Sequence, residues 1–183
     1  MPNTEQQFEH IISICRDLFK KKLTDYGASW RILRPQSVTD QILIKAKRIR
    51  SIEEKGVTKV DEGIASEFIG IVNYGIVALI QLELGHNDGI DITTDRAMEL
   101  YDKYMLQTKN LMFAKNHDYG EAWRSMRISS YTDLILVKLF RTKQIENNEG
   151  QTIVSEGVDA NYMDMINYSI FGLIKLNYPE DEE

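Results

Sequence analysis

Two pairs of basic residues lie on helix faces that are otherwise apolar, and they could bind an anion. Lys45 and Arg48 share a face with isoleucines, and Lys138 and Arg141 repeat the pattern further along the chain. A cation on an apolar face must reach solvent or find an anion, because an unpaired buried charge is costly. The partner is either an acid on a neighbouring helix or an anionic ligand such as phosphate, which arginine can bind with two parallel hydrogen bonds.

A second candidate for ligand binding is the motif Asp-Tyr-Gly-x-x-Trp-Arg-x-x-Arg, which occurs twice. Its aromatic rings could stack on a nucleotide base and its arginines could bind phosphates. The alternative is that the rings close the end of a helical bundle while the arginines pair with acids. The candidate ligand-binding residues are Asp25, Tyr26, Trp30, Arg31 and Arg34 in the first motif, and Asp118, Tyr119, Trp123, Arg124 and Arg127 in the second.

Oxygen-bearing side chains further along the chain are candidates for holding Mg²⁺, which prefers hard oxygen ligands. Glu156 and Asp164 share one face of a predicted helix, and Asp133 and Glu146 on the preceding helix could add further ligands. We predict a magnesium site from these four acids. The alternative is that Glu156 and Asp164 form salt bridges with Lys138 and Arg141.

The corresponding helix in the first half of the chain has fewer acids. It carries Glu62 and Asn73, with Gly70 at the place that Asp164 takes later. Glu62, Asn73 and the later Asn167 are therefore counted as ligand-binding candidates rather than metal ligands. No residue is assigned a catalytic role.

These residues recur because the chain is a tandem duplication. Asp25 and Asp118 are 93 positions apart, and after one inserted residue the offset becomes 94, as between Asn73 and Asn167. Rare residue types coincide in order, which is the signature of an internal repeat. We predict a first repeat at 1–85, a linker at 86–92, a second repeat at 93–178 and an acidic tail at 179–183, with both repeats packed as one globular unit.

Each repeat is expected to hold three helices, which predicts an all-α bundle. In the first repeat they span 4–23, from Ser37 or Thr39 to just before Gly56, and 61–84. In the second they span 94–115, a matching segment that stops before Gly150, and 155–176. Thr4 with Gln7 forms a capping-box pattern at the first helix.

Composition limits the classes of partner. The 183 residues carry 22 Lys and Arg against 28 Asp and Glu, a net charge of −6. Such a chain is a poor binder of nucleic acid on its own or of anionic membranes. The single Cys15 permits no intrachain disulfide, which suits the cytoplasm. The most apolar run, residues 68–84, contains polar residues and predicts a buried helix rather than a membrane span.

The motif, the Lys-x-x-Arg pattern and a later Glu-x₁₀-Asn-Tyr pattern together resemble the nucleotide modification associated domain 1 family, in both copies. The acidic helices are more distantly similar to MazG-like all-α nucleoside triphosphate pyrophosphohydrolases, which hold Mg²⁺ with carboxylates from two helices. The resemblance implies a nucleotide-related protein, with Mg²⁺-dependent hydrolysis of a free nucleotide as one function. A non-catalytic nucleotide-binding or regulatory module and a structural interaction protein are the alternatives. The expected partner is a nucleotide or another small phosphorylated ligand, and a homodimer is left open.

Overall fold

The chain folds into α-helices joined by short loops and two 3₁₀ turns. The computed structural model describes residues 3–55 and 60–179, with only the backbone described at 60–62. The first repeat holds α1 (Thr4–Tyr26), η1 (Ser29–Ile32), α2 (Pro35–Lys55) and α3 (Val60–Leu84). The second holds α4 (Thr94–Tyr119), η2 (Ala122–Ser125), α5 (Ile128–Asn147) and α6 (Val158–Asn177). The predicted all-α fold with three helices per repeat is confirmed for these residues.

Several helix ends differ from the sequence-based expectation. The N-cap of α1 is Asn3, whose side chain accepts a hydrogen bond from the backbone of Gln6 at 3.0 Å, so the predicted capping role of Thr4 is wrong. Both first helices run longer than expected, to Tyr26 and Tyr119, and their C-cap residues Gly27 and Gly120 adopt φ of 64°. Glycine reaches this left-handed region without the steric cost of a side chain. The predicted acidic tail lies, apart from position 179, outside the described residues.

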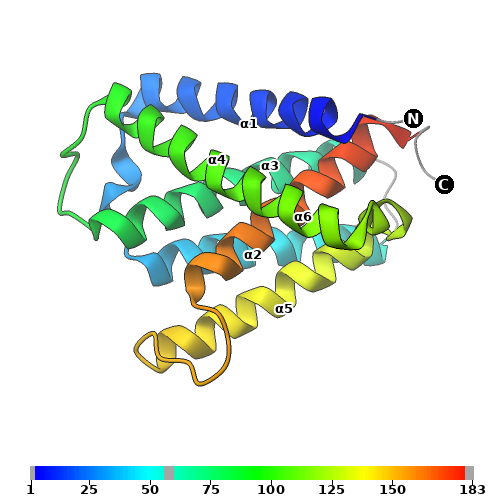
Figure 1. The fold of residues 1–183 in the computed structure, drawn as a ribbon. Helices are drawn as coiled ribbons and strands as arrows, with labels where there is room; N and C mark the ends of the chain where they lie inside the picture. The colour runs from blue at the N-terminus through cyan, green and yellow to red at the C-terminus, as the bar shows by residue number, and fades with distance from the viewer. Residues whose placement is uncertain (1–2, 56–59, 180–183) are drawn as a thin grey trace.

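The helices form three layers, with α3 and α6 in the middle (Figure 1). The α2 and α5 helices cover one face of this central pair, and α1 and α4 cover the other. Small residues allow the central helices to approach closely. A Cβ at Gly75 would lie 2.5 Å from Cγ1 of Ile166, and one at Gly172 would lie 3.0 Å from the Phe68 ring. The two repeats thus share one apolar core.

Contacts between the repeats are reciprocal. On one face, Thr39 donates a hydrogen bond to Glu146 at 3.1 Å, and its counterpart Thr132 donates to Glu53 at 3.3 Å. Four ion pairs form two further reciprocal sets: Lys143 with Asp40 and Arg50 with Asp133 between α2 and α5, and Arg16 with Asp102 and Lys109 with Glu9 between α1 and α4. Matching residues exchanged in this way are typical of a twofold, self-complementary interface. The chain therefore imitates a homodimer of single repeats.

Among the described residues one helical segment, Gly63–Leu84, is long and apolar enough to cross a membrane by length and composition alone. Its most apolar stretch is 61% buried inside the bundle, where α3 packs on α6 and α2. Burial by the protein's own helices accounts for this apolar surface, which is consistent with a soluble protein.

Candidate functional site

A pocket of about 560 Å³ opens in the first repeat, between α1, η1, α2 and α3. Four sequence-predicted binding residues line it: Tyr26, Trp30, Lys45 and Asn73. The structure adds two residues that sequence reasoning missed, Lys22 and Tyr74. Helical spacing was the signal that could have found Lys22, since it lies one turn before Tyr26 on α1.

The amine of Lys45 lies directly over Gly70. A Cβ at Gly70 would be 2.8 Å from Cδ and Cε of Lys45 and 3.1 Å from its Nζ. The Nζ atom is also 3.6 Å from the Glu67 carboxylate and 5.6 Å from the centre of the Tyr74 ring. Only the absence of a side chain at position 70 leaves room for this lysine against α3.

Positive charge exceeds negative charge around this pocket. Glu67 is buried and is shared between Lys45 and Arg48, whose Nη1 lies 2.5 Å from Oε1. Lys22 reaches the pocket from α1 and has no ion-pair partner in the part of the chain that the structure describes. Glu67 therefore offsets two cations while Lys22 adds a third positive charge at the pocket, and the partly buried setting of Lys45 strengthens the field on an anion there. Arg48 was predicted to bind a ligand directly, and its closest partner here is Glu67.

In the second repeat, the two corresponding lysines share a carboxylate at the position of Gly70. Asp164 stands where the first repeat has Gly70, and its side chain is only 5% exposed. Its carboxylate is 2.6 Å from Lys115 and 2.9 Å from Lys138. Lys115 and Lys138 are the counterparts of Lys22 and Lys45. Burial lowers the pKa of Lys115, but its hydrogen bond and charge interaction with Asp164 outweigh this and raise the pKa overall.

The aromatic residues of the two motifs also sit in different surroundings. Trp30 is partly exposed, lines the pocket and has its ring 6.1 Å from that of Phe19. Trp123 is 5% exposed and stacks on Phe171, with ring centres 4.4 Å apart and planes within 9°. The first repeat has Val77 in place of Phe171, so its tryptophan keeps an open face.

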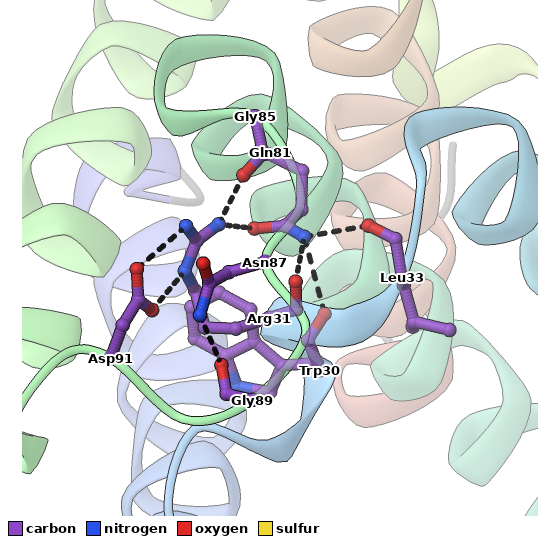
Figure 2. A network of polar contacts seen from close by, with 8 residues as sticks. All are labelled: Trp30, Arg31, Leu33, Gln81, Gly85, Asn87, Gly89 and Asp91. Atoms are coloured by element: carbon purple, nitrogen blue, oxygen red, sulfur yellow. Dashed lines mark hydrogen bonds and ion pairs between the residues drawn. The ribbon is translucent and has the colours of Figure 1, made fainter.

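Arg31, predicted to bind a ligand, is instead held by protein groups on all sides (Figure 2). It is 3% exposed, its Nε lies 2.8 Å from Asp91, and its Nη1 donates to Gln81 and to the carbonyl of Gly85. Gln81 in turn donates to the carbonyls of Trp30 and Arg31 in η1 and to that of Leu33, the C-cap of η1, at 2.6 Å. The network joins η1, the end of α3 and the connection between the repeats, and it fixes the position of Trp30.

The second repeat builds the equivalent link with other residues. Lys175, the counterpart of Gln81, donates to the carbonyl of Arg124 at 3.1 Å and to that of Met126. Arg124, another predicted ligand-binding residue, binds Glu121 and donates to Gln7 of α1 at 2.6 Å. Both motif arginines that follow tryptophan therefore hold the 3₁₀ turns in place.

The repeated asparagines bind backbone inside the bundle. Asn73 donates to the carbonyl of Cys15 at 3.1 Å, and Tyr101 donates to Asn73 Oδ1 at 2.8 Å. Asn167 donates to a carbonyl of α4 in the same way, at 3.1 Å, but its buried Oδ1 has no partner in the described part of the chain. Phe8 stands where the symmetric position would require a tyrosine hydroxyl.

The remaining predicted binding residues are spread over the surface. These exposed residues are Asp25, Arg34, Asp118, Tyr119, Arg127 and Arg141. The exposed fraction of Tyr119 is 77%, and Asp118 lies 3.3 Å from His117. The side chain of Glu62 falls outside the described residues.

The four predicted magnesium ligands do not meet in one place. Asp164 faces two lysines of its own repeat, whereas Asp133 and Glu146 face α2 of the other repeat, and Glu156 is exposed. No group of three or more His, Cys, Asp or Glu residues that could hold a metal ion occurs within the described ranges. The predicted salt-bridge alternative for Asp164 with Lys138 is the arrangement present. Binding of Mg²⁺ stays a prediction.

A protein family matches the chain in both repeats. The model of nucleotide modification associated domain 1 covers residues 22–82 and 115–176. The two segments begin at Lys22 and at its counterpart Lys115, and they include Lys45 and its counterpart Lys138. The search of curated proteins and that of solved structures each returned no match. The family description indicates a nucleotide-related role, and the chain belongs to the nucleotide modification associated domain 1 family as a tandem duplicate.

Proposed function

We propose that the pocket of the first repeat binds a nucleotide or another small phosphorylated ligand. The phosphate would lie between Lys22 and Lys45, and the ring system against Trp30 and Tyr74. The observation that carries this proposal is the pocket beside Lys45 and Gly70, whose described lining holds two lysines and no carboxylate. At the matching place, the second repeat supplies a carboxylate to the two corresponding lysines.

The chemistry of the pocket suits such a ligand. A phosphate monoester carries a charge of about −1.5 to −2 near neutral pH, which two ammonium groups would balance. Stacking of a base on an aromatic side chain contributes about 1–3 kcal/mol. The volume of about 560 Å³ lies within the range of about 300–1,000 Å³ that is usual for small-molecule sites.

A non-catalytic nucleotide-binding module fits these residues better than a Mg²⁺-dependent hydrolase. The described residues that line the pocket include lysines, hydroxyls and an amide, but no carboxylate. Metal-assisted hydrolysis of a phosphoanhydride needs carboxylates near the phosphates to hold the ion. A location in the cytoplasm, where free nucleotides are available, belongs to the same proposal.

The test is a binding and turnover assay on the intact chain. Nucleosides, nucleoside mono-, di- and triphosphates and inorganic phosphate are titrated by calorimetry, with Mg²⁺ and then with chelator, and the mixtures are analysed for products. We expect saturable binding of phosphorylated compounds, weaker binding of the nucleosides and no product. Formation of a monophosphate and pyrophosphate that stops on chelation would replace the module with a pyrophosphohydrolase. The absence of any binding would contradict both.

Matched variants locate the site. Lys22→Met and Lys45→Met each remove one ammonium group and keep much of the side-chain volume. Lys20→Met and Lys47→Met are the controls, because these exposed lysines lie on the same two helices but outside the pocket lining. We expect each pocket variant to weaken binding about tenfold or more, the value of one charge-assisted contact, and the controls to bind as the wild type does. Equal losses in all four variants would indicate only nonspecific attraction to positive charge.

A further inference from the structure

In the second repeat, Asp164 and Phe171 stand at the positions that Gly70 and Val77 take in the lining of the first pocket. We propose that this part of the second repeat is an occluded anion site, in which the carboxylate of Asp164 takes the place of a ligand's phosphate. The wild-type chain would then bind one phosphorylated ligand rather than two, and removing this carboxylate would open a second site for inorganic phosphate. The choice of phosphate as the ligand rests on the proposed function of the first repeat.

The lysines around Asp164 form a preformed cradle for an anion. Oδ1 lies 2.6 Å from Lys115 and Oδ2 lies 2.9 Å from Lys138, so one ammonium group approaches each oxygen. The Lys138 side chain is 17% exposed and comes from α5, while Lys115 comes from α4. Two helices thus aim cations at one point on α6. In the first repeat the matching lysines, Lys22 of α1 and Lys45 of α2, both line the pocket, and Lys45 lies over Gly70.

The acids have exchanged places between the repeats. The first repeat has a carboxylate at Glu67 and nothing at Gly70, whereas the second has the neutral Asn161 and then Asp164. Each repeat therefore keeps one buried acid near its lysines. In the first, the Glu67 carboxylate is 3.6 Å from Lys45, whose side chain lies over Gly70, and the described lining of the pocket beside this lysine holds no carboxylate.

The part of the second site that would receive a ring is closed as well. Phe171 fills the place of Val77 and stacks on Trp123, with ring centres 4.4 Å apart. Removing the Asp164 carboxylate should therefore admit phosphate alone, whereas a nucleotide should also require Phe171→Val. This separation of the two parts distinguishes the inferred site from general loosening of the bundle.

The experiment measures melting temperature with phosphate against chloride at equal ionic strength, in chains whose first site is blocked by Gly70→Asp. The blocked chain should show no phosphate effect. Adding Asp164→Gly should restore a rise of about 3 °C or more at phosphate concentrations tenfold above Kd, because a ligand stabilises the state that binds it. If Asp164→Gly impairs folding, adding Asn161→Glu supplies the acid that the first repeat uses and keeps the lysines compensated.

The outcomes separate this inference from the proposed function. A rise in melting temperature with phosphate in the wild type, but in neither chain that combines Gly70→Asp with Asp164→Gly, would overturn the occluded site and leave the first pocket in place. An effect in the blocked chains that lack Asp164, with none in the wild type, would support the second site and contradict the first. An equal effect in the chain with Gly70→Asp alone would show that phosphate acts elsewhere and would overturn both.

Discussion

The substitution Gly70→Asp should abolish ligand binding without unfolding the protein. It installs in the first repeat the carboxylate that the second repeat already has. The new Cβ would lie 2.8 Å from the terminal methylenes of Lys45, so this flexible side chain must shift by rotating away. The carboxylate would then occupy the space that we assign to the phosphate, and it would pair with Lys45 as Asp164 pairs with Lys138.

The size of the effect follows from electrostatics. Two like unit charges about 4 Å apart repel by about 4 kcal/mol at the effective dielectric constant of a half-buried site. Even if rearrangement relieves a third of this, the dissociation constant should rise about 100-fold, since each 1.4 kcal/mol is a factor of ten. Stability should change little, because aspartate is a better helix former than glycine by about 0.3 kcal/mol and the shift of Lys45 opposes that gain.

Calorimetric titration with the best ligand of the wild type measures the dissociation constant, and thermal unfolding measures stability. Gly70→Asn is the control, because asparagine fills the same volume without a charge and should weaken binding less than aspartate. Equal losses in the two variants would mean that the site is limited by space rather than by charge. Binding of the aspartate variant within threefold of the wild type would refute the assignment of this pocket as the anion site.

Three further predictions concern stability. Phe8→Tyr should raise the free energy of unfolding by about 1 kcal/mol, because the new hydroxyl would give the unpaired Oδ1 of Asn167 the partner that Tyr101 gives Asn73, and Tyr101→Phe should lower it by a similar amount. Chemical denaturation tests both variants, and a loss of stability in Phe8→Tyr would contradict this equivalence of the two repeats. Arg31→Lys should lower the free energy of unfolding by about 2 kcal/mol through lost bonds to buried acceptors, whereas unchanged stability with weakened ligand binding would restore its predicted ligand role. Burial raises the pKa of Glu146, so ionisation of its carboxyl opposes folding, and the stability that Glu146 contributes is lost as pH rises through that raised pKa. Glu146→Gln should therefore raise the free energy of unfolding at pH 7, and this gain should disappear below the ordinary pKa of 4.5. A gain in stability that is constant at all pH values would exclude this cause.

The duplication was readable from the sequence, and with it much of the architecture. Recurrence of Trp30 and Trp123 within the same spaced motif identified two equivalent units, and helical spacing of apolar residues predicted three helices in each. These features are local or periodic, so they survive in the order of residues along the chain. The helix ends were less predictable, because a cap such as Asn3 depends on backbone geometry at a single residue.

The identity of the binding residues depended on which helices face each other. Lys45 and Lys138 were singled out as cations needing an anion, and pairing of Lys138 with Asp164 was one of two alternatives. The sequence could not decide between them, nor show that Lys45 lines a pocket. Lys22 was missed although it lies one helical turn before Tyr26, because it reaches the pocket only through the packing of α1 beside α2 and α3.

The packing of the helices also decided which groups the predicted metal ligands contact. Asp133 and Glu146 looked like metal ligands on a helix face, yet that face turns toward the other repeat, where Arg50 and Thr39 bind them. Composition, repeat pattern and helical periodicity thus determined the fold class and the two equivalent candidate sites. Only the tertiary structure showed that Lys45 lies over Gly70 beside a pocket while Asp164 pairs with Lys115 and Lys138, because these contacts join residues of different helices through space.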